Sequence, residues 1–209
     1  MVEFEKMWTG KDEGLPSKLK ESLKPKTEIR KKIGLAVREL DRQSRKLDSA
    51  WTSLGQKDHR FYERVVKALR NHDRKRAILY ANELAEIRKT MRSISQARLA
   101  LEQISLRLNT VQDIGDIVAT LAPAMSVIRS VRGNLSTIIP KADKEFDGLS
   151  DMLGSILIDA SQTSGLTLNF SAANVEAEKI LKDAETQVEV EMREKLPSVP
   201  SAEREGLRL

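Results

Sequence analysis

The sequence predicts an all-α protein built on a long antiparallel helical hairpin, with helices over about 27–70 and 74–112 followed by shorter ones. No proline occurs between Pro25 and Pro123, and apolar residues recur at helical spacing through most of that stretch. Charged residues make up 32% of the chain, against about 25% in an average domain, and aromatic residues only 4%. Few large rings are therefore present to fill a globular core, and an elongated bundle is favoured.

Charge is divided unevenly along the chain. Residues 1–98 carry 25 Lys+Arg and 14 Asp+Glu, a net of +11, whereas residues 99–209 carry 11 and 17, a net of −6. A chain with opposite charges in its two halves can fold its acidic half onto its basic half, or offer the basic half to an anionic surface. This pattern favours a scaffold that binds a polyanion over an enzyme with a cleft.

The first 26 residues are expected to be irregular, because glycines and prolines interrupt any helix there. Thr27 follows Pro25 closely and is expected to cap the first helix. Ahead of it, Met1–Trp8 holds five apolar residues, among them Phe4 and Trp8, which could insert into the interface of a bilayer. The alternative is a tail that is disordered or folded onto the hairpin, and two acidic residues within the segment oppose insertion.

Each arm of the hairpin carries its own series of apolar residues, at steps of three, four or seven. Two segments contain residues that favour a turn, Gly55–Asp58 and Asn71–Asp73. The apolar spacing continues unbroken through Gly55, because Leu54 and Phe61 are seven residues apart, so we place the turn at 71–73. The two series are Ile29, Ile33, Val37, Leu40, Leu47, Trp51, Leu54, Phe61, Val65, Leu69 and Leu84, Ile87, Met91, Ile94, Ala97, Leu101, Ile104, Leu108, Val111.

Beyond Gly115 the helices are expected to be shorter, since Pro123 and Pro140 each end one. A polar linker over Ser161–Ser171 is expected to precede a charged amphipathic helix. The expected helices are Gly115–Leu121, Ala124–Ile139, Asp143–Ile158 and Asn174–Lys195.

Lysine and arginine are concentrated in residues 18–46, which hold 11 of them against 4 acidic residues. Spacings of seven, four and three place Lys31, Arg38, Arg42 and Arg45 on one helix face, and spacings of three and four do the same for a second group. This second group is Arg64, Lys67, Arg70 and Arg74. Such a stripe suits an acidic lipid surface, where each cation contributes about 1 kcal/mol. Nucleic acid would also suit it, and an ordinary solvated helix face is the third interpretation. The proposed membrane-binding cations are Lys31, Arg38, Arg42, Arg45, Arg64, Lys67 and Arg70.

The tail contains two prolines in a short apolar segment, formed by Leu196, Pro197, Val199 and Pro200 around a serine. Such a segment is extended and loses little entropy on binding, which suits it to a groove on a partner protein. A simple linker is the alternative interpretation.

Several kinds of chemistry find no support in the sequence. The absence of cysteine excludes disulfides, zinc–thiolate sites and cysteine nucleophiles. His59 and His72 are not spaced as metal ligands on a helix, and no phosphate-binding or nucleophile-elbow motif is present. The least charged stretch, Ile117–Ile128, is shorter than the roughly 20 residues of a spanning helix. We therefore expect no enzyme, cofactor or metal site, and expect Glu83 and Glu86 to pair with Arg88 and Lys89 on their own helix.

The order of these features resembles the ESCRT-III family. The matching segments are the run Val37–Gln43 in the first helix, the basic segment Asp73–Ala77 at the hairpin tip, and Leu196–Pro200, which looks like a proline-containing MIT-interacting motif. The resemblance covers roughly residues 20–200. Within the family the chain looks most like the archaeal cell-division (Cdv) B-type proteins, as a shorter paralogue without the C-terminal winged-helix-like extension.

The resemblance implies a domain organisation and a mechanism. Residues 1–26 would be a membrane-proximal segment, 27–160 an ESCRT-III-like helical core, 161–172 a linker, and 173–209 a C-terminal helix with a MIT-interacting tail. The acidic late helices would hold the chain closed on the basic hairpin. After opening, the chain would polymerise with itself and with paralogous subunits on anionic lipid, at the inner face of the cell membrane where the cell divides. A MIT-domain AAA+ ATPase would bind the tail and disassemble the filament.

Two rival interpretations remain from the sequence. One is a non-polymerising basic coiled-coil adaptor or nucleic-acid-binding protein, although the scarcity of aromatic residues argues against base stacking. The other is a structural coiled-coil dimer of fixed size.

Overall fold

The computed structural model describes residues 17–111, 113–136, 138–139, 142–165 and 170–198. All regular structure in these ranges is helical, which confirms the predicted fold class. The five helices are α1 (Ser17–Arg70), α2 (Arg74–Thr110), α3 (Ile114–Leu135), α4 (Ala142–Ser164) and α5 (Phe170–Lys195).

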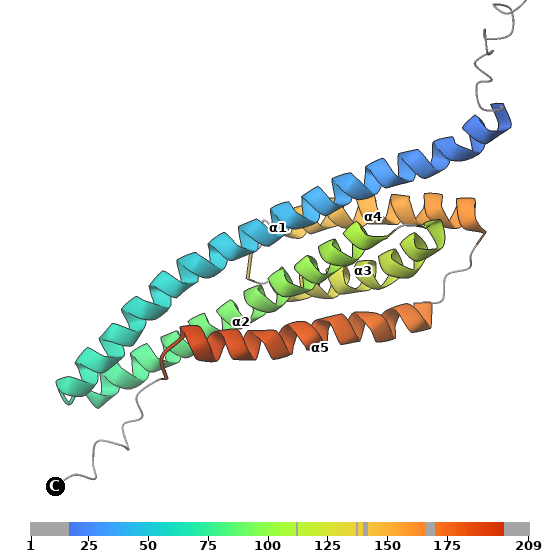
Figure 1. Ribbon diagram of the computed structural model, residues 1–209. Helices are drawn as coiled ribbons and strands as arrows, with labels where there is room; N and C mark the ends of the chain where they lie inside the picture. The colour runs from blue at the N-terminus through green and yellow to red at the C-terminus, as the bar shows by residue number, and fades with distance from the viewer. Residues whose placement is uncertain (1–16, 112, 137, 140–141, 166–169, 199–209) are drawn as a thin grey trace, which may run out of the picture.

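Helices α1 and α2 form the predicted antiparallel hairpin, and α1 extends beyond the other helices at its N-terminal end (Figure 1). The 54 residues of α1 span about 80 Å at 1.5 Å per residue. The turn lies at Asn71–Asp73, as the apolar spacing predicted, with His72 at a φ of 53°. Asp73 caps α2, because its side chain accepts a hydrogen bond of 3.1 Å from the backbone amide of Arg76.

The register of the hairpin is fixed by three side-chain contacts across it. Asp58 pairs with Arg88, Ser44 donates to Glu102 at 3.1 Å, and Ser105 donates to Asp41 at 2.7 Å. The two residue numbers of each pair add to the same value, so the arms run past one another without a slip. A one-step shift would separate all three pairs at once.

Several predicted helix ends are wrong, and two prolines account for most of the error. Helix α1 begins at Ser17, so residues 17–26 are helical, the chain passes through Pro25, and Thr27 is no cap. Likewise α3 runs through Pro123 as one helix, where two were expected. Proline removes one N–H and crowds the preceding turn, at about 3 kcal/mol, but its fixed φ is close to the helical value. A long helix therefore continues through it.

The polar segment around residue 165 is shorter than the expected linker. Helix α4 extends to Ser164 and α5 begins at Phe170, so much of 161–172 is helical. Gly165, with a φ of 67°, follows the last turn of α4. That left-handed conformation favours glycine, which explains where α4 ends.

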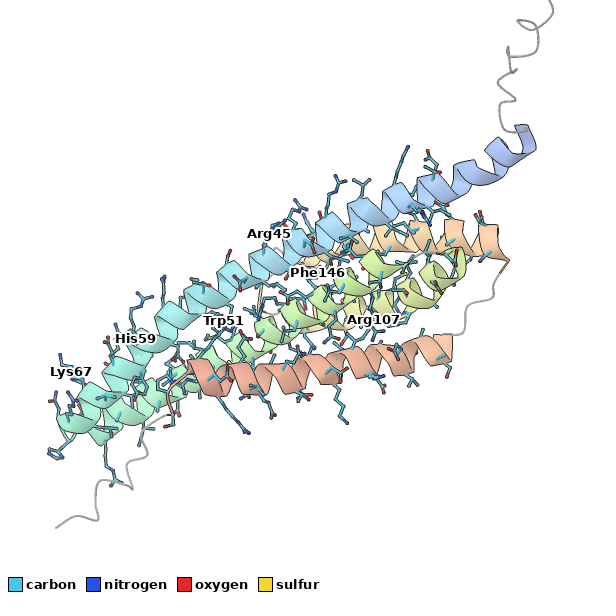
Figure 2. The ribbon with its side chains drawn as sticks, in the orientation of Figure 1. Arg45, Trp51, His59, Lys67, Arg107 and Phe146 are labelled. Carbon is cyan, nitrogen blue, oxygen red and sulfur yellow. The ribbon has the colours of Figure 1, made fainter. Side chains whose placement is uncertain are left out.

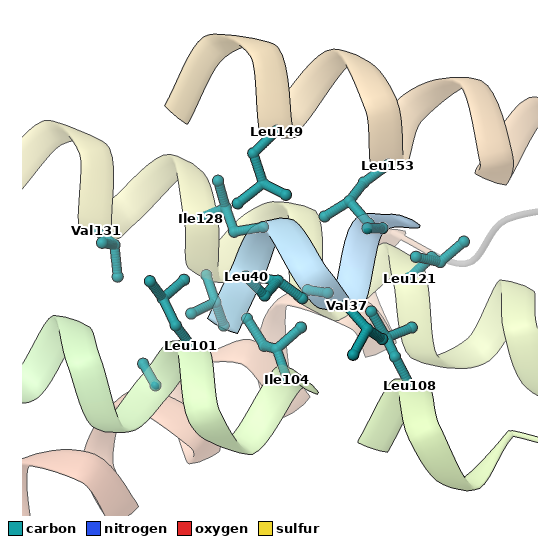
Figure 3. Packing of buried hydrophobic residues seen from close by; sticks show 14 of the residues in the cluster. Val37, Leu40, Leu101, Ile104, Leu108, Leu121, Ile128, Val131, Leu149 and Leu153 are labelled. Carbon is teal, nitrogen blue, oxygen red and sulfur yellow. The ribbon is translucent and has the colours of Figure 1, made fainter. Parts of the chain in front are cut away.

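Helices α3, α4 and α5 pack against the half of the hairpin that lies away from its tip (Figure 1). Leu40 of α1, Leu101 of α2, Leu121 of α3 and Leu149 of α4 are each fully buried in the core that these helices share (Figure 3). A smaller cluster of Met91, Val188 and Met192 joins α2 to α5. The predicted series on α2 is confirmed as the inner face, with Leu84, Met91, Ile94, Ala97, Leu101, Ile104 and Leu108 all buried.

Candidate cationic interface along α1

Arg74, which was grouped with Arg64, Lys67 and Arg70, is the first residue of α2 and lies on the other side of the turn. The seven proposed membrane-binding cations all lie on α1 and are all exposed. We call this set, Lys31, Arg38, Arg42, Arg45, Arg64, Lys67 and Arg70, the cationic face. Figure 2 shows Arg45 and Lys67 on the side of α1 that is turned away from the other helices. Their helical spacing keeps them opposite the apolar series that α1 buries.

Most of the cationic face has no anionic partner within the described part of the chain. Lys31, Arg38, Arg45, Lys67 and Arg70 form no ion pair there. Among residues 27–70 of α1, for which side-chain burial is described, only Glu28, Asp48 and Glu63 are exposed acids. The face is therefore strongly positive.

The two remaining cations of the face are held by neighbours on the hairpin. Arg42 lies 2.6 Å from Glu39 on the same helix. Burial raises the pKa of Glu39, but hydrogen bonds from Arg42 and Gln43 outweigh this and leave it below the usual value. Arg64 lies over the rings of Phe61 and Tyr80, at 5.2 and 5.8 Å from their centroids.

A second set of α1 cations holds α4 against the hairpin. Lys32 lies 2.6 Å from Asp159, and Lys46 lies 2.5 Å from Glu145. The two lysines are fourteen residues apart, close to four helical turns, and so are the two acids. Helix α4 therefore runs antiparallel to α1, in register with one flank of it.

Helix α5 is held on α2 by acids that bind arginines. Glu191 accepts hydrogen bonds from Ser95 at 2.5 Å and from Arg98 at 3.0 Å, and Arg107 lies 2.6 Å from Glu176. At the end of α5, the ammonium of Lys195 lies 4.7 Å from the ring centroid of Trp51 on α1.

These contacts lower the pKa of both Glu191 and Glu176. Burial raises the pKa of Glu191, but hydrogen bonds from Lys195 and Ser95 and the charge of Arg98 bring it below the usual value. The hydrogen bond from Arg107 likewise lowers the pKa of Glu176. Arg107 of α2 therefore stabilises the charged form of Glu176, whereas Glu191 is stabilised by Lys195 of its own helix together with Ser95 and Arg98 of α2.

Two further arginines form ion pairs that stabilise the bundle itself. Arg132 of α3 binds Asp143 at 2.6 Å and also binds Asp147, and its hydrogen bond lowers the pKa of Asp143. Asp58, only 2% exposed, forms a bidentate pair with Arg88, at 2.6 and 3.2 Å.

The Asp58 pair corrects one prediction. Arg88 was expected to bind an acid on its own helix, but its partner lies on α1. The companion prediction, for Lys89, is confirmed by a distance of 3.9 Å to Glu86. One signal in the sequence could have found Asp58: it lies at a position of α1 that faces α2 once the turn is placed at 71–73.

The other predicted site residues are only partly described. Phe4 and Trp8 lie outside the described residues, as do Val199 and Pro200. Leu196 is half-buried against the cluster that joins α2 to α5, whereas Pro197 is exposed. Leu196 and Pro197 also line an open groove of about 830 Å³ between α2 and the end of α5.

Within the described ranges, none of the five helices is both long enough and apolar enough to cross a bilayer. The same ranges contain no cluster of three or more carboxylate or imidazole side chains that would hold a metal ion.

Comparison with known proteins gives consistent matches along the chain. The Snf7 family model matches residues 35–204. The chain is 37% identical over 200 residues to Cell division protein B1 of Sulfolobus acidocaldarius, across 96% of this chain and 91% of that protein. It is 30% identical over 177 residues to Cell division protein B of the same organism, across 85% of this chain and 68% of that protein. No solved structure matches.

Proposed function

The chain belongs to the Snf7 (ESCRT-III) family, and from this membership we propose that it is a filament subunit of archaeal cell division. It polymerises on anionic membrane with copies of itself and with paralogous subunits, and the filament constricts and severs the membrane. Its role is structural and not enzymatic. The similarity to two archaeal cell division proteins supports a role in cell division.

The observation that carries the membrane part of the proposal is the cationic face. Six of its seven cations, all but Arg42, have no ion-pair partner in the described part of the chain, and they lie on one face of the longest helix. A cation close to an anionic leaflet contributes about 1 kcal/mol. If only half of the face touches lipid at once, about three such contributions still add to roughly 3 kcal/mol. The protein would then lie on the inner face of the cell membrane at the division site.

Polymerisation requires surfaces that the closed chain covers. Helices α3, α4 and α5 bury a large apolar area of the hairpin, and ion pairs hold α4 and α5 in place. Release of these helices would expose that apolar surface, which neighbouring subunits would cover in a filament. The acids of α4 and α5 would then be free to bind cations of the next subunit.

The tail supports the proposal of an ATPase partner. Residues Leu196–Pro200 follow α5 directly, as a MIT-interacting motif would. Leu196 packs on the α2–α5 cluster, so a MIT domain that binds it would compete with that packing. Force applied to the tail by a AAA+ ATPase would be transmitted first to α5.

The membrane proposal is tested by reversing three charges of the cationic face. In the triple variant Arg38→Glu, Arg42→Glu, Arg45→Glu, the loss of three cations lowers partitioning onto anionic vesicles by about 100-fold or more. Pelleting with phosphatidylglycerol vesicles measures it, with phosphatidylcholine vesicles as the neutral reference.

The matched control reverses three exposed cations of α5, Lys179, Lys182 and Arg193, which changes the net charge by the same amount. This control should keep most of its binding. Wild-type protein that binds neither vesicle, or both equally, would refute the proposal. An equal loss in both triple variants would show that net charge alone, and no particular face, governs binding.

A further inference from the structure

Neighbouring cations of α1 have opposite surroundings at two places. Lys31 is exposed and unpaired within the described chain, whereas the adjacent Lys32 binds Asp159 of α4. Arg45 is likewise exposed and unpaired, whereas the adjacent Lys46 binds Glu145 of α4. Successive residues of a helix point about 100° apart, so α4 can occupy one flank of α1 and leave the next strip of surface uncovered.

Helix α4 adds little negative charge beside the cationic face. Four of its five acidic side chains are bound to cations: Asp143 and Asp147 to Arg132, Glu145 to Lys46, and Asp159 to Lys32. Asp151 is exposed and has no such partner in the described part of the chain. A surface approaching the cationic face therefore meets a nearly neutral α4.

The acids of α5 lie away from the cationic face as well. Helix α5 packs along α2 (Figure 1), and its closing contacts use Arg98 and Arg107 of α2. Neither closing helix pairs with Lys31, Arg38, Arg45, Lys67 or Arg70. The charges that keep the chain closed are therefore a different set from the charges that remain free.

We propose that the closed chain binds an anionic bilayer through the cationic face while α4 and α5 remain packed on the hairpin, so that attachment does not require opening. This inference rests on the proposed function, since it concerns the same membrane-binding surface. It assigns membrane attachment and polymerisation to separate sets of charged residues. The cationic face recruits the closed subunit, and the α4 and α5 contacts control only its polymerisation.

The first test compares two double reversals at adjacent positions of α1. Lys31→Glu with Arg45→Glu removes two free cations, and we expect binding to phosphatidylglycerol vesicles to fall about 30-fold or more. Lys32→Glu with Lys46→Glu makes the same change of net charge but sets acid against Asp159 and Glu145. That variant should release α4 and lose much less binding.

The second test measures vesicle binding by protein in which a cross-link keeps α4 or α5 on the hairpin. The chain has no cysteine, so two introduced thiols are unique. Arg107→Cys with Glu176→Cys replaces side chains that touch at 2.6 Å, and a short bis-maleimide then joins α2 to α5. Lys32→Cys with Asp159→Cys joins α1 to α4 in the same way. Each pair removes one positive and one negative charge, so net charge is unchanged.

We expect each cross-linked protein to pellet with phosphatidylglycerol vesicles within about twofold of the same variant without cross-linker. Adding Lys31→Glu and Arg45→Glu should lower binding by about 30-fold or more both with and without the cross-linker. Cross-linked protein that stays in solution while the open form binds would overturn the inference and leave the proposed function standing. Tighter binding by the Lys32, Lys46 variant than by wild type would also overturn it. Full binding by the Lys31, Arg45 variant without cross-linker would instead refute the proposed membrane surface itself.

Discussion

Glu191 accepts hydrogen bonds from two residues of α2, and Glu191→Gln tests how much these contacts contribute to the docking of α5. Its carboxylate is only 16% exposed and accepts hydrogen bonds from Ser95, Arg98 and Lys195 at 2.5, 3.0 and 2.7 Å. Glutamine has nearly the same shape, so the substitution removes the charge and one acceptor while the packing of α5 is preserved.

The expected loss follows from the exposure of each partner. Lys195 is 52% exposed, so its pair with Glu191 contributes only about 0.3–0.5 kcal/mol. Arg98 is 17% exposed, and hydrogen bonds to such charged groups contribute about 1.5–3 kcal/mol. After substitution, Arg98 keeps Glu102 at 3.3 Å as a charged partner, while its buried Nε still has none. A loss of about 2 kcal/mol is therefore expected, which is about a 30-fold shift toward undocked α5.

Amide hydrogen exchange of α5 measures this shift without unfolding the protein. We expect exchange in peptides covering residues 176–192 to accelerate about 30-fold in Glu191→Gln, whereas peptides from the hairpin tip remain unchanged. Glu189→Gln is the matched control, because Glu189 is exposed on the same helix and has no partner in the described chain. Equal exchange in the two variants would show that apolar packing alone holds α5, and the reasoning would fail.

Three further predictions concern stability. Asp58→Ala leaves Arg88 without its buried partner and should lower the free energy of unfolding by about 3–5 kcal/mol in urea melts, and replacing the pair by Leu and Met should restore most of the loss. Leu40→Ala, at a fully buried site, should cost about 2–5 kcal/mol, whereas Leu35→Ala, 53% exposed on the same helix, should stay within about 0.5 kcal/mol of wild type. The pKa of Glu191 is lowered in the folded state, so its stabilisation is complete above the ordinary value of 4.5 and disappears as pH falls through the folded value. Exchange of α5, corrected for intrinsic rates, should therefore accelerate below about pH 4.5, and more so in wild type than in Glu191→Gln.

The hairpin was predictable because two long packed helices require apolar residues at regular helical spacing along both segments. The apolar spacing passed through Gly55 without a break, and that continuity placed the turn at 71–73, where the structure has it. The helix ends were less predictable. Pro25 and Pro123 indicated interruptions, but the cost of a proline is small beside the packing of a long helix, and only tertiary contacts decide that balance.

The cationic face was predictable by the same periodic argument, since spacing alone determines which side chains share a face. The partners of individual charges were not. Arg88 has acids nearby on its own helix, yet it binds Asp58, thirty residues earlier in the sequence. Nothing in the local sequence separates these options, because the choice depends on the register between two helices.

The uneven distribution of charge predicted an acidic half docked on a basic half, and this holds only for part of the basic half. The acids of α4 meet Lys32 and Lys46, while Lys31 and Arg45, one residue away, remain free. In sequence the members of each pair look equivalent. They differ because each helical residue turns by about 100°, and a helix packed on one flank reaches only one of two neighbours. Net charge therefore overstates how far docking neutralises the hairpin, and a chain can be closed by its charges while it still presents a strongly positive surface.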